Sequence, residues 1–322
     1  MTTKDIDSPV LVTGGAGFLG SHLVDRLLNS GHEVIVVDNY STGDESNLGH
    51  HSDTSNLEVV ETDIKRSLPT FDSIGAIFHL ASRADPTAFV ERGIDIAMTN
   101  SNGTHRVLEA ANCHDATVVI ASTSEVYGDP EVHPQPETYT GRVDCRGPRA
   151  SYNVGKRFAE TLGTLYHDER GVDVRTVRIF NTYGPRMRAD DSRVVPSFVS
   201  RAIRGDRLCV HGDGTQTRSF CYVSDLVDGL LCVATEPSLA GEVVNLGNDR
   251  EVSIRRLAEL VCEVVAENPG IDHGPARPQD PTVRCPDLSR AREVLGWEPT
   301  VSLETGLRRT VENFRGRVEL HR

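Results

Sequence analysis

Tyr152 and Lys156, four residues apart, form the pair of side chains best suited to acid and base chemistry in this sequence. On a helix, residues at this spacing lie on the same face, one turn apart. An ammonium so placed can lower the pKa of a phenol from its usual value of about 10 toward neutral pH. The tyrosine could then act as a general base and acid. Taken alone, such a pair is more often an ordinary surface contact on a helix.

Lysine is rare in this chain, which makes its place after the tyrosine informative. Of the 34 basic residues only Lys4, Lys65 and Lys156 are lysines. Arginine is larger and planar, and so a poorer substitute for a compact ammonium beside a phenol. We therefore treat the pair as catalytic, together with the upstream stretch 121–128, ASTSEVYG, which adds hydroxyl groups and Glu125.

A glycine-rich turn near the start of the chain could hold a dinucleotide. The apolar run 10–12 leads into TGGAGFLG at 13–20, and a helical pattern follows until Gly31. Glycines there allow a tight turn and let the backbone approach a pyrophosphate at the helix N-terminus. Asp38 ends the next predicted strand, where its carboxylate can bind the adenosine ribose and repel a 2′-phosphate. The pattern favours NAD over NADP, the alternative being a glycine-rich turn without a ligand.

Alternation of strands and helices predicts an α/β fold with a Rossmann-type, doubly wound parallel sheet. Ligands of such sheets bind at the carboxyl ends of the strands. This rule places Asp63 and Ile64 near the adenine, Leu80 and Ala81 along the cofactor, and residues 122–125 beside the nicotinamide. A helix N-cap is an equally good interpretation of Asp63. The predicted strands are 10–12, 33–37, 57–60, 76–80, 117–121 and 174–179.

After residue 182 the sequence changes character, with loops rich in Arg, Asp and Gly between shorter helices. We expect an NAD-binding Rossmann domain at 1–182 and a smaller substrate-binding lobe at 183–322, closely packed and partly interleaved. Arginines in this part could grip a diphosphate, and Arg218 and Arg284 are the best placed. The predicted helices of this part are 194–203, 223–233, 253–265, 287–295 and 303–314. Earlier amphipathic helices, at 100–111 and 151–166, could meet a partner subunit in a homodimer.

Composition excludes several classes of function. A net charge of −13 disfavours nucleic-acid binding, which needs a basic surface. No apolar run reaches the roughly 18 residues that span a bilayer, and the start of the chain does not resemble a signal peptide, so we expect a cytoplasmic protein without a membrane partner. The seven cysteines show no metal-ligand spacing, so we expect reduced thiols and no metal site.

These motifs together resemble the extended short-chain dehydrogenase/reductase family, whose members modify nucleotide sugars. Segments 122–135, 146–152 and 178–187, with RVVPSF, GDGTQTRSFCYVSDLVDGL and PDLSRAREVLGWEP further on, are similar to the UDP-glucuronate decarboxylases, also called UDP-xylose synthases. The resemblance runs from about residue 9 to residue 315. It implies NAD as cofactor and a UDP-sugar as substrate.

The resemblance also implies a set of site residues. The catalytic residues would be Thr123, Glu125, Tyr152, Lys156 and Arg284. The substrate would contact Ser124, Asn181, Val195, Arg218 and Arg284, whereas Tyr127 would only pack in the interior. For Arg284, roles in proton handling with Glu125 and in binding the diphosphate are equally open. The cofactor would contact Gly14, Gly17, Phe18, Leu19, Gly20, Asp38, Asn39, Asp63, Ile64, Leu80, Ala81, Asn100, Tyr152 and Lys156.

The implied reaction is oxidation at C4 by Tyr152 and NAD, loss of the C6 carboxylate, and return of the hydride. Ser124 stands where the related dehydratases have an aspartate, and loss of carbon dioxide needs no acid for a leaving hydroxyl. The chain departs from the decarboxylase pattern at Asn153 and Val154 and at Arg83, which could pair with a carboxylate. Alternatives are a 4-epimerase, an oxidative decarboxylase that releases the 4-keto pentose, and a noncatalytic dinucleotide sensor.

Overall fold

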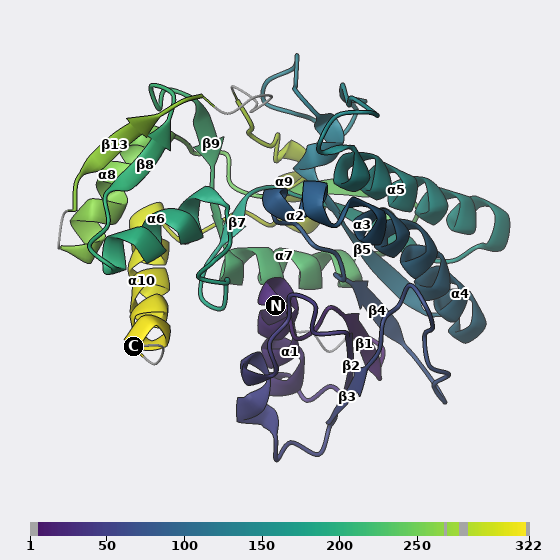
Figure 1. The fold of residues 1–322 in the computed structure, drawn as a ribbon. Coiled ribbons are helices and arrows are strands. Elements are labelled where there is room, and N and C mark those ends of the chain that lie inside the picture. Colours follow the sequence, from purple (N-terminus) through teal and green to yellow (C-terminus); the bar gives the residue numbers. More distant parts are fainter. Residues whose placement is uncertain (1–5, 267–268, 277–282, 320–322) are drawn as a thin grey trace.

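A seven-stranded parallel sheet forms the centre of the molecule in the computed structural model, which describes residues 6–266, 269–276 and 283–319. Figure 1 shows helices covering both faces of this sheet. The predicted Rossmann-type fold is confirmed. In spatial order the strands are β11 (Val243–Leu246), β6 (Val174–Ile179), β5 (Thr117–Thr123), β4 (Ala76–His79), β1 (Val10–Thr13), β2 (Val34–Asp38) and β3 (Leu57–Glu61).

Alternating strand residues face two separate apolar layers. Val10 and Val12 of β1 pack toward α1 and α7, whereas Leu11 between them packs toward α4 and α5. This follows from the two-residue period of a strand, and fully buried parallel strands are apolar on both faces. The covering helices are α1 (Phe18–Asn29), α7 (Val223–Thr235), α4 (Thr104–His114) and α5 (Ala150–Arg170).

The second lobe is built on three helices that the sequence predicted and on short strands that it did not. Two strand pairs, β8 with β13 and β9 with β12, lie beside these helices (Figure 1). Strands of three or four residues carry too little alternation to be recognised. The elements of the second lobe are α6 (Val194–Ile203), β8 (Leu208–His211), β9 (Thr217–Ser219), β12 (Glu251–Ser253), α8 (Ile254–Val265), β13 (Ile271–Gly274) and α10 (Leu303–Glu319).

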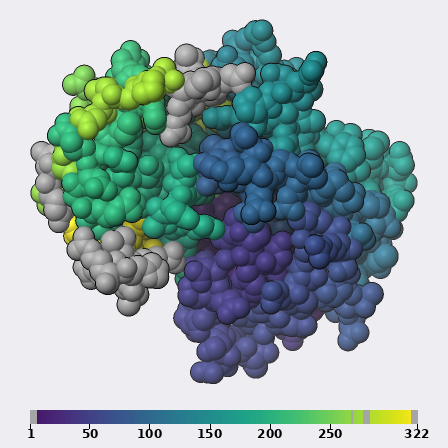
Figure 2. All heavy atoms as spheres, in the orientation of Figure 1, coloured from purple at the N-terminus to yellow at the C-terminus, as the bar shows by residue number. Residues whose placement is uncertain are grey.

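The chain crosses between the two parts more than once. β11, α7 and α9, all beyond residue 182, return to the large sheet or to the helices on it. Figure 2 shows the N-terminal residues in purple and blue against the second lobe in green. The remaining elements are β7 (Thr182–Tyr183), β10 (Cys221–Tyr222), α2 (Pro86–Glu91), α3 (Gly93–Met98), α9 (Ser289–Leu295), the 3₁₀ turns η2 (Glu45–Asn47), η3 (Gly49–His51), η5 (Ser124–Tyr127) and η6 (Pro237–Leu239), and the π-helical turn η4 (Thr99–Gly103).

Candidate active site

A cavity of about 970 Å³ opens at the carboxyl ends of the strands, between the sheet and the second lobe. Asp38, Thr123 and Ile179 line it from the ends of β2, β5 and β6, and Val195 and Arg218 from the second lobe. With one exception, Asn100, the residues predicted to bind cofactor or substrate or to catalyse line this cavity.

Thr123, Tyr152 and Lys156 meet at one wall of the cavity. Thr123 ends β5, and the other two lie on the first turns of α5, with all three side chains buried. The Tyr152 ring stacks on Phe89 with centroids 4.6 Å apart. The Lys156 ammonium donates to the Ala121 carbonyl at 2.6 Å, which fixes it beneath the strand end. The wall therefore presents a phenol, a hydroxyl and an amine to the same space.

The electrostatics of this wall differ from the sequence prediction. Burial raises the pKa of Tyr152 to about 12. The hydrogen bond with Thr123 lowers this pKa in part, whereas the negative charge of Glu125 raises it further. Burial lowers the pKa of Lys156 to about 8. The prediction that the ammonium lowers the phenol's pKa is thus wrong for the chain by itself, because desolvation by burial is the largest influence on this pKa and raises it.

Glu125 lies in the cavity wall between two arginines. Its Oε1 accepts from Arg284 Nη1 at 2.5 Å and from Arg149 Nη1 at 3.0 Å. Burial alone would raise the pKa of Glu125, but the charges and hydrogen bonds of Arg284 and then Arg149 hold it below the usual value. The carboxylate therefore stays ionised at neutral pH and is fixed in one position.

Two further arginines, Arg83 and Arg193, line the cavity. Arg83 follows β4, and its buried Nε has no partner among the described residues. Arg193 precedes α6 and is held by Asp191, with Nη2 and Oδ2 2.6 Å apart. Guanidinium groups are suited to binding carboxylate or phosphate oxygens.

The glycine-rich turn packs tightly against the backbone around it and lines the cavity. Gly14 has a φ of +75°, and a Cβ there would lie 2.9 Å from the backbone of Ala81. A Cβ on Gly20 would lie 2.1 Å from the Gly14 carbonyl oxygen. Gly17 caps α1 without a side-chain bond, and the first turn of the helix has no acidic residue. These features fit the pyrophosphate of a dinucleotide, which the N-terminus of α1 would attract.

Asp38 stands at the end of β2, beside this turn. Its carboxylate accepts from the backbone N–H of Ala16 at 3.0 Å and of Tyr40 at 2.9 Å. Burial raises the pKa of Asp38 despite these bonds. The side chain also lines the cavity, where it fits the ribose hydroxyls of a dinucleotide.

Asp63 and Asn39 lie next along the same wall. Asp63 accepts from the backbone N–H of Lys65 and pairs with the Lys65 ammonium at 3.0 Å. The alternative of a helix N-cap is wrong, since a turn and no helix follows at 64–66. The remaining predicted cofactor contacts, Phe18, Leu19, Ile64, Leu80 and Ala81, line the cavity as well.

Two conspicuous residues are set back from the cavity. Asn100 sits in the π-helical turn η4, is fully buried, and donates from Nδ2 to the Ile96 carbonyl at 3.0 Å. Asn100 packs against α5 and does not line the cavity, and its predicted contact with the cofactor stays a prediction. Tyr127 donates to Asn245 at 2.8 Å, and it packs in the interior as the sequence suggested.

The predicted substrate residues line the cavity as well. Asn181 donates from Nδ2 to the Ser219 carbonyl at 3.1 Å, and Arg218 donates from Nη1 to the Thr217 carbonyl at 2.7 Å. Ser124 follows Thr123 at the end of β5, and Val195 lies on α6. The sequence does not single out Arg149, because only the fold brings it to Glu125 across 24 residues; the signal available is its place in segment 146–152.

Comparison with known proteins identifies a family to which most of the chain is similar. Residues 10–247 match the model of the NAD dependent epimerase/dehydratase family. The chain is 47% identical to UDP-glucuronic acid decarboxylase 1 of Xenopus tropicalis over 310 residues, 96% of this chain and 73% of that protein. It is 46% identical to UDP-glucuronic acid decarboxylase 5 of Arabidopsis thaliana, with 97% and 91% covered.

Solved structures share the fold over nearly the full length. The UDP-glucose 4-epimerase of Thermotoga maritima, solved with UDP-glucose, has a TM-score of 0.85 and 32% identity, with 96% of this chain and 99% of that chain covered. A double mutant of the dTDP-glucose 4,6-dehydratase of Streptomyces venezuelae, solved with NAD, has a TM-score of 0.86 and 28% identity, with 97% and 98% covered. The chain belongs to the NAD-dependent epimerase/dehydratase family and, within it, to the UDP-glucuronic acid decarboxylases.

Proposed function

We propose that this protein is an NAD-dependent enzyme that decarboxylates UDP-glucuronate to UDP-xylose through a 4-keto intermediate. The observation that carries the proposal is the meeting of Thr123, Tyr152 and Lys156 at one wall of the cavity, next to Glu125. Identity of 47% to a UDP-glucuronic acid decarboxylase over 96% of the chain supports the choice of substrate. A noncatalytic sensor of dinucleotides would have no use for this grouping.

In the first step, Tyr152 takes the proton of the C4 hydroxyl, with Thr123 orienting that hydroxyl and Lys156 fixed behind it. When bound, NAD supplies the acceptor for the C4 hydride, a positive charge near the phenol, and later the source of the returning hydride. The phenol of the chain alone is protonated at neutral pH. Its activation therefore depends on positive charge brought to this wall, in line with the effect of opposite charge on a pKa.

In the second step, the C6 carboxylate lies β to the new ketone and leaves as carbon dioxide. Tyr152 and Thr123 stabilise the resulting enolate through hydrogen bonds to its oxygen. Ser124 in place of an acidic residue suits this step, since no hydroxyl has to leave. Protonation at C5 and return of the hydride to C4 complete UDP-xylose.

Glu125 and Arg284 act together near C5 in this proposal. Their contact at 2.5 Å supports a place for Arg284 beside the reacting sugar rather than at the diphosphate. The rest of the UDP-sugar is then bound by Arg218, Asn181 and Val195. We propose Arg83 as the partner of the substrate carboxylate, a role that its unpaired Nε supports.

We also propose that the enzyme is a cytoplasmic homodimer with an NAD-binding domain at 1–182 and a substrate lobe at 183–322. Apolar side chains lie exposed on α2, α3 and α5, among them Val90, Ile94 and Phe158 at 70%, 84% and 46%. A second copy of the chain could cover them.

The cysteines bear on the proposed location. All seven, each in the described part of the chain, are free thiols, which suits a reducing compartment. No described helix has both the length and the apolar character needed to cross a membrane.

Incubation with NAD and UDP-glucuronate, followed by mass spectrometry of the product, tests the proposed reaction. Loss of carbon dioxide alone indicates UDP-xylose. Loss of carbon dioxide and two hydrogens, with NADH in solution, indicates an oxidative decarboxylase. An unchanged mass with altered sugar stereochemistry indicates a 4-epimerase.

A further inference from the structure

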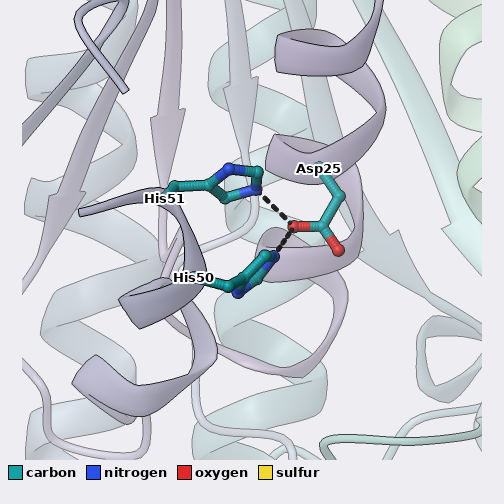
Figure 3. A group of neighbouring side chains, drawn as sticks. All are labelled: Asp25, His50 and His51. Atoms are coloured by element: carbon teal, nitrogen blue, oxygen red, sulfur yellow. Dashed lines mark hydrogen bonds and ion pairs between the residues drawn. The ribbon is translucent and has the colours of Figure 1, made fainter. Parts of the chain in front are cut away.

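Asp25, His50 and His51 form a compact group of side chains away from the proposed active site. Asp25 lies on α1, and the two histidines lie on η3, in the segment that follows β2. Nε2 of His50 and Nε2 of His51 each lie 2.9 Å from Oδ1 of Asp25. Figure 3 shows both imidazole rings directed at the same carboxylate oxygen. Among the described residues, no other group of three His, Cys, Asp or Glu side chains converges in this way.

We propose that this group is a binding site for a divalent transition-metal ion, with Zn²⁺ as its ligand. Two imidazole nitrogens and one carboxylate oxygen are ligands that Zn²⁺ prefers, and water can complete a tetrahedron. With metal–ligand distances near 2.0 Å, the ligand atoms of a tetrahedral site lie about 3.3 Å apart. The two nitrogens are already 2.9 Å from the oxygen, and all three ligand atoms lie within 4.8 Å of one another, so small side-chain movements bring them to this spacing.

Binding of Zn²⁺ leaves the number of protons on each imidazole ring unchanged. Without the metal, the N–H at each Nε2 donates a hydrogen bond to Asp25 and the proton stays on the ring. When Zn²⁺ binds, it takes the place of these two protons, and each ring carries its proton on Nδ1 instead. The ring centroids of His50 and His51 are 4.0 Å apart and the planes are inclined at 40°, so the two rings lie next to each other and face the same carboxylate (Figure 3).

The surroundings suit a metal site. Arg186 Nη2 lies 2.8 Å from Asp25 Oδ2, which orients the carboxylate and leaves Oδ1 to the histidines. Such outer contacts typically fix the geometry of metal ligands. The side chains of Asp25 and His51 are 21% and 13% exposed, whereas His50 is 47% exposed. His50 therefore marks an entry path for the ion and for a water ligand.

Zn²⁺ at this site would fasten one segment of the cavity rim to α1. The segment 44–51 already rests on the glycine-rich turn, through the Asp44 N–H and the Asn47 Nδ2, which donate to the Ala16 carbonyl at 3.1 and 2.9 Å. Ser41 and Thr42, just before it, line the cavity. A metal bridge from η3 to α1 would stabilise this arrangement without contributing a group to the reaction.

Titration calorimetry of the full-length protein with Zn²⁺, after treatment with a chelator, tests the proposal. We expect one Zn²⁺ per chain in addition to any weaker sites, and at least a tenfold loss of affinity in His50→Ala and in His51→Ala. His133→Ala is the matched control, because His133 also pairs with a carboxylate, Glu251, at 3.0 Å but has no third ligand. It should bind Zn²⁺ as the wild type does. Excess Mg²⁺ should not compete, since that ion prefers oxygen ligands.

Two readouts keep the result interpretable. Co²⁺ in place of Zn²⁺ should give visible absorption that the His50→Ala, His51→Ala double variant lacks. Circular dichroism should show the same fold for all variants, since His50 is 47% exposed and His51, at 13%, bonds through its ring, among the described residues, only to Asp25 at the edge of the fold. Equal Zn²⁺ affinity and stoichiometry in the wild type and the double variant, or no binding by the folded wild type, would overturn the proposal.

Discussion

Arg284 and Glu125, 159 residues apart in sequence, form an ion pair of 2.5 Å at the edge of the active-site cavity. Arg149 binds the same carboxylate oxygen from the start of α5. The second lobe is thereby joined to the strand end that carries Thr123. These contacts keep the Glu125 carboxylate ionised and hold the guanidinium groups of Arg284 and Arg149 in fixed positions.

Tyr152→Phe should lower kcat by about 10³-fold or more, since it removes the only group proposed to move the C4 proton. Binding of NAD should be nearly unchanged. Tyr127→Phe is the matched control, because that phenol is buried beside Asn245 and outside the cavity. Steady-state kinetics with UDP-glucuronate and titration with NAD measure both effects. A Tyr152→Phe enzyme with wild-type turnover would remove this residue from the mechanism.

Glu125→Gln should lower kcat by about 10²-fold or more, because proton handling at C5 is lost. Arg149→Gln should cost less, since Arg284 still holds the carboxylate. The two changes share one ion pair, so the double variant should be no slower than Glu125→Gln alone. A double-mutant cycle on kcat measures the coupling, and strictly additive effects would show that Arg149 does not act through Glu125.

Lys156→Met should change how stability depends on pH. The pKa of Lys156 is about 8 in the folded chain and 10.5 as the ordinary value. Between these two pH values the unfolded chain binds the proton and the folded chain does not, so this group makes stability rise with pH. Relative to Lys156→Met, the wild type should gain up to about 3 kcal/mol of unfolding free energy from pH 7 to pH 10.5. Urea unfolding at several pH values measures this difference, and a constant difference would contradict the lowered pKa.

Asp38→Asn should weaken the preference for NAD over NADP by roughly tenfold, or about 1.4 kcal/mol. The reason is that the carboxylate charge, which repels a 2′-phosphate, is lost while the side chain keeps its size. Titration with each dinucleotide measures the ratio. An unchanged ratio would mean that Asp38 serves only to hold the backbone of Ala16 and Tyr40.

Ile94→Lys should convert the proposed homodimer into a monomer, because it places a charge at the most exposed of the large apolar side chains on α2, α3 and α5. Val132→Lys is the control, since Val132 is also exposed, at 41%, but lies in a loop outside these helices. Light scattering after size-exclusion chromatography gives the mass of each. A dimeric Ile94→Lys protein would place the interface elsewhere.

The sequence predicts the sheet well because its strands are long and apolar and its helices strongly periodic. The bounds of β6 and α6 are those expected. The expected helix at 100–111 is interrupted by the π-helical turn at its start, which no local pattern indicates. The pairing of β8 with β13 could not be predicted, since it joins segments about 60 residues apart through strands of four residues.

Some features of the active site could also be predicted from the sequence, and others could not. Motif residues such as Tyr152 and Asp38 could be placed from strand ends and glycine spacing. The partners of Glu125 depend on loops that only the folded chain brings together. The pKa of Tyr152 could not be judged from the neighbouring lysine, because burial, which raises it, is a property of the whole packed interior.

The most direct test of the account uses UDP-glucuronate that carries deuterium at C4. If the hydride leaves C4 and returns from the same bound cofactor, the UDP-xylose formed should retain the deuterium at C4, and no NADH should accumulate. Decarboxylated product that has lost the deuterium, or substrate that remains unchanged with folded enzyme and NAD present, would contradict the account.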